Sequence, residues 1–392
     1  MFELRLKPRE ERRLRAGHLW VYSNEVDTAK SPLAELKPGE LCKVLDSRGK
    51  PLGLGYANPR TLLCARLLTG NPVATIDAGW IALRVRAAVA LRDRIYPQPF
   101  YRAVYSEADG LPGLVVDRYG DVLSVQMSTA GMENLKAEVI AALKQELKPH
   151  GIWLGNDVPM REQEGLPLYT EAVGEVPDTV VLEEAGVKFE VSLKAGQKTG
   201  WFFDQRDNRD RLARYTRGRS VLDVFSYVGG WALRALKAGA ASAACLDSSE
   251  PALAAAQRSA ALNGMNLEAI QGKALDVLRE LGPKGRRFDV VVLDPPALIK
   301  RKKDLEKGLA HYGALNRAAM ELLSPDGIFV SCSCSHHLEA EQLQRILLRE
   351  SRAAGRRLQI LEVGAQGPDH PVHPAIPETR YLKAFFCRVT QG

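Results

Sequence analysis

The chain is 392 residues long, carries 54 Lys and Arg against 47 Asp and Glu for a formal charge of +7, and is 45% hydrophobic. This length and composition exclude a disordered or fibrous protein and predict roughly two to four compact units. There is no apolar run of about 18 residues, and charges alternate through the first eleven positions. We therefore expect no membrane span, no secretory signal and a cytoplasmic location.

The six cysteines are too few and too scattered for a disulfide framework, which fits a reducing compartment. The surplus of positive charge is compatible with a polyanionic partner, but net charge by itself does not select one.

Residues 1–72 predict a small β-rich domain, because short apolar stretches at 41–45 and 61–66 are separated by turn signals such as Pro38-Gly39. A basic, helix-like segment is expected over 5–15. It runs into His18 and Trp20, which become candidates for RNA binding by charge and base stacking. The alternative is a solvated helix face followed by a core tryptophan, and composition by itself favours it.

Residues 76–185 predict a central α+β domain. Helices are expected over 76–91 and 132–147, and a hairpin over 113–125 turns at Tyr119-Gly120-Asp121. The region carries no catalytic constellation of its own. It is therefore interpreted as a scaffold or an RNA-facing adaptor.

From residue 186 to residue 392, strands alternate with helices, which is typical of a parallel sheet covered on both faces. This pattern predicts a Rossmann-like α/β domain. The strands are expected over 220–225, 243–247, 267–271, 288–294, 327–333, 358–363 and 381–390, and the helices over 230–238, 251–263, 274–281, 305–323 and 339–354.

Ligands of such sheets bind at the carboxyl ends of the strands, where this sequence carries acids and a glycine turn. A single Asp at a strand end is more often a helix cap, but four on successive strands are a less expected accident. The turn lacks the first glycine of the G-x-G-x-x-G fingerprint, which argues against a pyrophosphate. The predicted contacts with the ligand are Asp223, Phe225, Ser226, Tyr227, Gly229, Asp247, Asp276 and Asp294.

The ligand that suits these residues is S-adenosylmethionine, an adenosine with a cationic sulfonium and no phosphate. Asp247 follows Asp223 by 24 residues and stands where such sheets bind the two ribose hydroxyls. Asp276 suits the adenine amine.

Residues 223–230, together with Asp294-Pro295-Pro296, resemble the motif set of class I methyltransferases. Residues 196–209 are similar to a hallmark of bacterial large-subunit rRNA methyltransferases, and this resemblance adds Lys198 and Thr199 to the expected cofactor contacts.

Nearly the whole chain resembles the cytosine-5 branch of that family. Residues 17–25 match its N-terminal PUA domain, residues 106–114 its central domain, and residues 369–372 and 381–383 its C-terminus. The resemblance implies a PUA-like RNA-binding domain over 1–72, a central domain over 76–185 and a methyltransferase domain over 186–392. It also implies that the product is 5-methylcytidine in 23S rRNA, and that the partner is this RNA or a large-subunit assembly intermediate. Related enzymes lead us to expect a homodimer, which no sequence feature demonstrates.

Carbon 5 of cytosine is a poor nucleophile, so methylation there requires a thiolate to add at carbon 6. Cys332 and Cys334 near the end of a predicted strand share one face, and spacing does not choose between them. We choose Cys334 because it lies further past the strand end and because the residues after it align better with the family. Asp294 is expected to be catalytic as well, through a hydrogen bond to the target base.

Three alternatives remain. Zinc binding by Cys332, Cys334, His336 and His337 is disfavoured by their cramped spacing, and no metal is predicted. Methylation of a base nitrogen commonly uses an aromatic residue after the Asp-Pro-Pro motif, where this chain has Ala297; a guanine ring nitrogen is not excluded by this. A non-catalytic PUA-type RNA-binding factor is disfavoured because the cofactor residues are retained.

Positive charge also gathers near the predicted site. Arg206 and Arg209, in a basic stretch over 206–219, are expected to form structural ion pairs with Asp204 and Asp207. Four consecutive cations are the better candidates for RNA phosphates: Lys300, Arg301, Lys302 and Lys303. The sequence does not identify the modified nucleotide, the assembly state of the RNA or the base that removes the carbon 5 proton.

Overall fold

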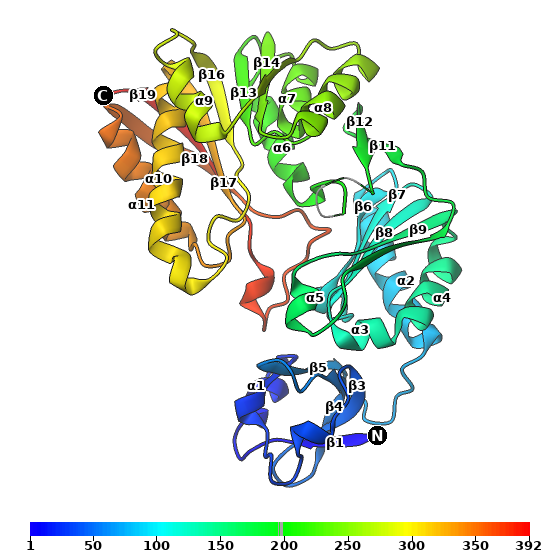
Figure 1. Cartoon of the computed structure of the whole chain (residues 1–392). Coiled ribbons are helices and arrows are strands. Elements are labelled where there is room, and N and C mark those ends of the chain that lie inside the picture. Colours follow the sequence, from blue (N-terminus) through cyan, green and yellow to red (C-terminus); the bar gives the residue numbers. More distant parts are fainter. Residues whose placement is uncertain (195, 197–198) are drawn as a thin grey trace. The chain divides into compact units, whose positions relative to one another are not determined.

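The computed structural model describes residues 1–194, 196 and 199–392 (Figure 1). These residues form two compact units. Unit 1 comprises Met1–Val180, Ser192–Trp201 and Pro368–Thr379, and unit 2 comprises Val181–Val191, Phe202–Gly367 and Arg380–Gly392. Lys198, predicted to contact the cofactor, lies outside the described residues.

Unit 1 begins with a five-stranded sheet, which confirms the predicted β-rich N-terminal region. Its strand order is β1-β3-β4-β5-β2. Leu4, Val21, Val44 and Ala65 are among the buried residues of its core. The strands are β1 (Phe2–Arg5), β2 (Trp20–Tyr22), β3 (Glu40–Leu45), β4 (Pro51–Ala57) and β5 (Leu63–Thr69).

The helix expected over residues 5–15 is wrong in its first half. The helix α1 spans only Glu11–Arg15. Pro8 has no backbone N–H to donate, and Arg9 has a φ of 76°, in the left-handed region. The first residues are instead extended in β1, which pairs in parallel with β3, and residues 8–10 form a turn before α1.

The second sheet of unit 1 has the order β10-β9-β8-β7-β6. The predicted hairpin is confirmed, with Tyr119 paired to Val122. The helix expected over 132–147 is interrupted at Leu135, and the helices α2 and α4 pack against each other and contribute to the core of this sheet. The elements are α2 (Ala78–Ile95), β6 (Phe100–Tyr105), β7 (Leu114–Tyr119), β8 (Val122–Met127), α3 (Ala130–Asn134), α4 (Lys136–Leu147), β9 (Gly151–Asn156), α5 (Met160–Gln163) and β10 (Tyr169–Gly174).

Unit 2 opens with the hairpin β11 (Thr179–Glu184) and β12 (Val187–Ser192), whose first and last residues fall in unit 1. A seven-stranded sheet of order β15-β14-β13-β16-β17-β19-β18 follows. Its strands are β13 (Ser220–Val224), β14 (Ser242–Asp247), β15 (Glu268–Gln271), β16 (Phe288–Leu293), β17 (Leu323–Ser333), β18 (Arg356–Gly364) and β19 (Lys383–Gln391).

Helices cover both faces of this sheet, as Figure 1 shows. One face packs on residues of α6, α7 and α8, and the other on residues of α9, α10 and α11. These helices are α6 (Arg206–Leu212), α7 (Gly230–Lys237), α8 (Glu250–Leu262), α9 (Ala274–Leu281), α10 (Leu305–Glu321) and α11 (Ala340–Ala353). The Rossmann-like prediction is confirmed, and the predicted elements agree with the observed ones within a few residues.

The sheet is not parallel throughout. The strand β19 runs antiparallel to both β17 and β18, because β18 leads into β19 without a crossover helix. The parallel strands reverse their order on either side of β13, which makes β13 and β16 the topological switch point. Ligands of open α/β sheets bind there, at the carboxyl ends of the strands.

A buried carboxylate anchors the β11–β12 hairpin within unit 2. Glu184 accepts hydrogen bonds from Arg209 at 2.7 and 2.6 Å, and Arg206 and Arg234 lie 3.5 and 3.9 Å from it. Burial by itself raises the pKa of Glu184, but the three guanidinium groups outweigh it and the net pKa is lowered. Arg206 and Arg209 thus have a partner, Glu184, outside their own basic stretch.

Among the described residues, no helix is long and apolar enough to cross a bilayer.

We predict that Glu184→Gln lowers the free energy of unfolding by about 3–5 kcal/mol, because it leaves buried guanidinium groups without a countercharge. A carboxyl group with a lowered folded-state pKa stabilises fully above its unfolded pKa, and this stabilisation is lost as the pH falls through the folded pKa. The difference between wild type and variant should therefore be complete at neutral pH and shrink in acid. Urea denaturation at several pH values measures it, with the half-buried neighbour changed in Glu183→Gln as the control. Equal stability of wild type and Glu184→Gln at pH 7 would contradict the prediction.

Candidate functional site

The loop between β13 and α7 has a left-handed backbone conformation at every second residue. Phe225, Tyr227 and Gly229 have φ values of 63°, 51° and 79°, all in the left-handed region. Such a conformation costs of order 1–3 kcal/mol at each non-glycine residue, and it clusters at ligand sites. A Cβ at Gly229 would meet the Cβ of Ala256 at 3.2 Å and the Sγ of Cys245 at 3.3 Å. The loop therefore needs glycine at this position.

Asp247, the last residue of β14, holds this loop. Its carboxylate accepts hydrogen bonds from the backbone N–H groups of Tyr227 and Ser249, both at 2.9 Å. The backbone N–H of Phe225 donates to the carbonyl oxygen of Leu246 at 2.9 Å. Asp247, the residue predicted to bind the ribose hydroxyls, thus lies directly beside the predicted glycine turn. Two backbone N–H donors fix the orientation of its carboxylate.

Asp223 is fully buried on β13, one residue before the strand ends. Its Oδ2 accepts from the backbone N–H of Ala232 at 3.1 Å, and its Oδ1 is buried without a hydrogen-bond partner, as is the Oγ of Ser226. Burial, followed by the charges of Asp294 and Asp247, raises the pKa of Asp223 to about 8. The site therefore crowds carboxyl groups together and holds buried polar atoms without a hydrogen-bond partner.

Asp294 follows the end of β16 and has three hydrogen bonds. Gln205 donates through Nε2 to both carboxylate oxygens at 3.0 Å, and the indole N–H of Trp231 donates at 3.1 Å. The amide of Gln205 is oriented in turn by Asn208, which donates to its Oε1 at 2.7 Å. Burial raises the pKa of Asp294 to about 6 against the opposing effect of the Trp231 hydrogen bond.

Gln205 and Trp231 were not assigned roles from sequence. Gln205 belongs to the stretch 196–209 that carried the family resemblance, and Trp231 begins the first turn of α7 after Gly230. These positions in or beside the family motifs were the only sequence feature that pointed to a role for either residue. Neither residue type indicates by itself that it binds a carboxylate.

The two cysteines differ in their surroundings. Cys332 is a β17 residue opposite Ala384 of β19 and is fully buried. Cys334 lies just beyond the end of β17 and is half-buried, with its Sγ 4.0 Å from the carbonyl oxygen of Pro295. The structure therefore brings Cys334 next to the loop that follows Asp294. Burial raises the pKa of the Cys332 thiol well above its ordinary value.

These residues fit S-adenosylmethionine. Asp247 can accept from ribose hydroxyls, while Asp223 and Asp294 together provide negative charge for the cationic part of the molecule. The same crowded carboxylates would repel a phosphate, which agrees with the absence of the pyrophosphate fingerprint. The unpartnered Oδ1 of Asp223 supplies an acceptor that a bound donor would satisfy.

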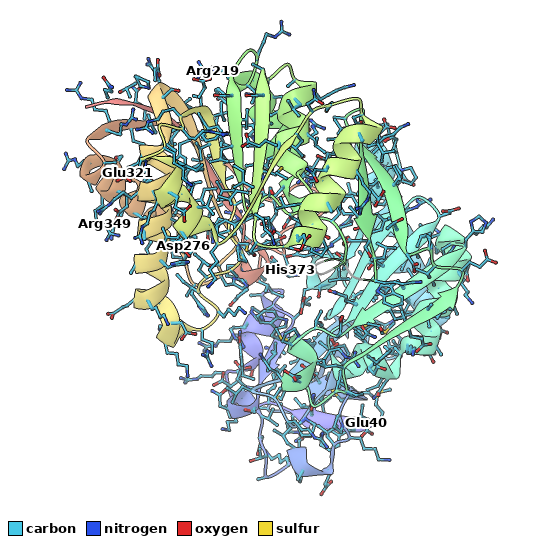
Figure 2. All side chains as sticks on the ribbon, turned by 45° about the horizontal axis from the view of Figure 1, so that its top comes forward. Glu40, Arg219, Asp276, Glu321, Arg349 and His373 are labelled. Atoms are coloured by element: carbon cyan, nitrogen blue, oxygen red, sulfur yellow. The ribbon has the colours of Figure 1, made fainter. Side chains whose placement is uncertain are left out.

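Two further described residues were predicted to contact the cofactor, Asp276 and Thr199. Asp276 is exposed in the first turn of α9 (Figure 2). Thr199 belongs to unit 1, where its buried hydroxyl donates to Asp117 and its carbonyl oxygen accepts from Tyr119 at 3.1 Å. The Thr199 side chain thus has a structural partner in unit 1, and the roles of both residues toward the cofactor stay predictions.

The predicted RNA-binding residues have mixed surroundings. His18 and Trp20 are half-buried in unit 1, and the indole N–H of Trp20 donates to Glu107 at 3.0 Å. Burial and the charge of Arg13 lower the pKa of His18. The four cations at 300–303 in unit 2 are all exposed, and one of them, Arg301, pairs with Asp304 at 3.0 Å.

Among the described residues, no cluster of three or more His, Cys, Asp or Glu side chains could hold a metal ion.

Comparison with known proteins identifies two matching families. Residues 4–70 match the family of PUA-like domains, and residues 169–388 match the family of S-adenosylmethionine-dependent methyltransferases. Ribosomal RNA large subunit methyltransferase I from Shewanella frigidimarina is 36% identical over 394 residues, covering 98% of this chain and 99% of its own. The protein of the same name from Cronobacter sakazakii is 36% identical over 391 residues and 98% of each chain.

The fold also has close counterparts among solved structures. SMU.776, described as a methyltransferase complexed with SAH, superposes with a TM-score of 0.84 at 19% identity, over 99% of this chain and 100% of that one. A protein from Streptococcus mutans described as a SAM-dependent methyltransferase gives a TM-score of 0.83 at 18% identity with the same coverage. At this identity the likeness establishes the shared fold.

We predict that Asp223→Asn stabilises the ligand-free protein and weakens its binding of S-adenosylmethionine. A carboxyl group whose folded-state pKa is raised destabilises the fold as the pH rises from its unfolded pKa toward its folded pKa. The gain in melting temperature should therefore be small near pH 4 and large near pH 8, at about 2–4 °C for each kcal/mol recovered.

Thermal melts across this pH range and calorimetric titration with the cofactor measure the two effects. Asp276→Asn, at an exposed position, is the control for stability. A pH-independent difference in melting temperature, or unchanged cofactor affinity, would contradict the role given to Asp223.

Proposed function

The chain belongs to the ribosomal RNA large subunit methyltransferase I family, and on that premise we propose that it methylates carbon 5 of a cytosine in 23S rRNA through a Cys334 thiolate. The observation that carries this proposal is the place of Cys334. Its half-buried Sγ lies just beyond β17 and 4.0 Å from the carbonyl oxygen of Pro295, directly after Asp294. A nucleophile and a carboxyl group thus flank the same loop.

The chemistry needs two protein groups at the base. The Cys334 thiolate forms a bond to carbon 6, and the resulting enamine makes carbon 5 nucleophilic. S-adenosylmethionine, when bound, supplies an electrophilic methyl group. Loss of the proton from carbon 5 then restores the carbon 5–carbon 6 double bond as the carbon–sulfur bond breaks and the thiolate leaves.

Asp294 supports the addition step. Its pKa, raised to about 6, lets this carboxyl group exchange a proton near neutral pH, and Gln205 and Trp231 hold it in one orientation. A carboxyl group in this place can hydrogen-bond the ring nitrogen or amine of cytosine while negative charge moves into the ring. We therefore assign Asp294 to the target base as well as to the cofactor, and Asp223 and Asp247 to the cofactor.

Cys332 is the less suitable nucleophile. It is fully buried opposite Ala384 of β19, and its raised thiol pKa disfavours the thiolate. Its surroundings are those of a packing cysteine in a strand.

The substrate we propose is 23S rRNA or an assembly intermediate of the large subunit. The exposed cations at 300–303 follow the Asp294-Pro295-Pro296 loop within a few residues, so they lie near the proposed reaction centre in the chain. Exposed lysines and arginines bind phosphates without reading sequence, and they position an RNA rather than select it.

We predict that the protein forms a denaturation-resistant adduct with rRNA transcripts containing 5-fluorocytidine when the cofactor is present, because fluorine at carbon 5 cannot leave as a proton does. Mass spectrometry should map the adduct to Cys334. Cys334→Ala should abolish methyl transfer and the adduct while leaving cofactor affinity unchanged, and Cys332→Ala serves as the matched control.

Each other outcome has a definite meaning. An adduct on Cys332 would keep the reaction and correct the residue. Methyl transfer to unmodified RNA without an adduct would replace the proposal by a ring-nitrogen methyltransferase. Cofactor binding without any methyl transfer would favour a non-catalytic RNA-binding factor.

We predict that Lys300→Glu combined with Lys302→Glu weakens rRNA binding and lowers the slope of log affinity against log salt by about 2, since each lost phosphate contact removes roughly one released counterion. Arg345→Glu with Arg352→Glu, at exposed positions of α11, changes the net charge equally and is the control. Filter binding at several salt concentrations measures both. Equal slopes for the two double variants would refute a local role of residues 300–303.

A further inference from the structure

Serine and cysteine alternate along the segment that contains Cys334. Along β17 and just beyond it, Ser331, Ser333 and Ser335 are buried at every second position, with the two cysteines between them. Successive side chains of a strand point to opposite faces. The serines therefore line the face that α10 covers, and Cys332 packs with the opposite cluster.

A buried tyrosine of α10 ties these serines together. The hydroxyl of Tyr312 lies 2.9 Å from the Oγ of Ser333 and 3.0 Å from the Oγ of Ser335. The Oγ of Ser335 also accepts from the backbone N–H of Ile299 at 3.1 Å. One hydroxyl network thus connects the segment holding Cys334 with the segment that follows the Asp294-Pro295-Pro296 loop.

The side chain of Lys383, at the start of β19, binds backbone carbonyl groups of the same segment. Its Nζ donates to the carbonyl oxygens of Ser335 at 2.8 Å and Leu338 at 2.7 Å. The ammonium group therefore binds the carbonyl of the residue directly after Cys334. Burial lowers the pKa of Lys383, and the charge of Cys334 acts in the opposite direction.

We propose that Lys383 and Tyr312 are positioning residues for Cys334: the Lys383 ammonium holds the turn after β17 and stabilises the thiolate, and Tyr312 fixes the turn to the loop after Asp294. This inference rests on the proposed function, in which Cys334 is the nucleophile.

The electrostatic part follows from reciprocity. If a thiolate at Cys334 stabilises the charged form of Lys383, then the ammonium of Lys383 stabilises the thiolate by the same free energy. A cation beside a cysteine is the usual means of making a thiol reactive near neutral pH.

Among the described residues, the groups that act most strongly on this segment include no second cation. Tyr312 and Cys332 interact electrostatically with Cys334 and carry no positive charge, Glu339 acts on Lys383, and Asp294 acts on Cys332. Lys383 is thus a cation that two hydrogen bonds attach to this turn.

The test is the pH dependence of Cys334 alkylation by iodoacetamide in the full chain, with the labelled cysteine identified by mass spectrometry. The other five cysteines are buried, so labelling of the native protein should report Cys334. Rates are measured between about pH 6 and pH 10, which brackets the ordinary titration of a thiol.

Lys383→Met should move the alkylation midpoint upward by about one pH unit. Lys383→Arg, which keeps the charge, should leave the midpoint near that of wild type. Lys383→Gln, which can still donate to a carbonyl, replaces the Met variant if that variant does not fold, as judged by cofactor binding. An unchanged midpoint in a folded, uncharged variant would overturn the electrostatic role.

Tyr312→Phe should lower kcat for methyl transfer while leaving the alkylation midpoint and the KM for RNA unchanged, because it loosens the turn without changing its charge. An unchanged kcat would remove Tyr312 from the proposal. Alkylation does not require methyl transfer, so activity retained by Cys334→Ala would refute the proposed function while the Lys383 comparison still measures the effect on the thiol.

Discussion

The crowding of three carboxyl groups at neighbouring strand ends is the constraint on which the site of this protein depends. Asp223, Asp247 and Asp294 stand at or near the ends of three neighbouring parallel strands, so the sheet itself brings their charges together. Burial and the neighbouring charges raise the pKa of Asp223 and of Asp294. We propose that a cationic cofactor offsets this crowding of carboxyl groups.

Hydrogen bonds and a bent backbone around the site hold these carboxyl groups in place. Gln205 and Trp231 donate to Asp294, and the backbone after β13 bends through left-handed conformations so that its N–H groups reach Leu246 and Asp247. Strain in the backbone and charge in the side chains are thus concentrated at one end of the sheet. The remaining helices and strands are regular and provide the rigid apolar layers that hold this end in place.

The end of β17 shows how one strand can serve two requirements. Its serine face joins α10 by hydrogen bonds, and the opposite face carries Cys332 into the apolar core. Where the strand stops after Ser333, the alternation leads out of the core, and Cys334 becomes half-buried. Two cysteines of the same spacing and face therefore have different chemical surroundings.

Local patterns in the sequence by themselves determined the elements of the sheet, its Rossmann-like class and the acids at its strand ends, because hydrophobic period, caps and turn residues act over a few positions. Only the tertiary structure decided the antiparallel placement of β19, the pairing of Arg209 with Glu184, and the contacts of Gln205 and Trp231 with Asp294. It also gave the Thr199 hydroxyl its partner Asp117 within unit 1. These contacts join residues far apart in the chain, so their formation depends on how complete layers pack rather than on any local preference.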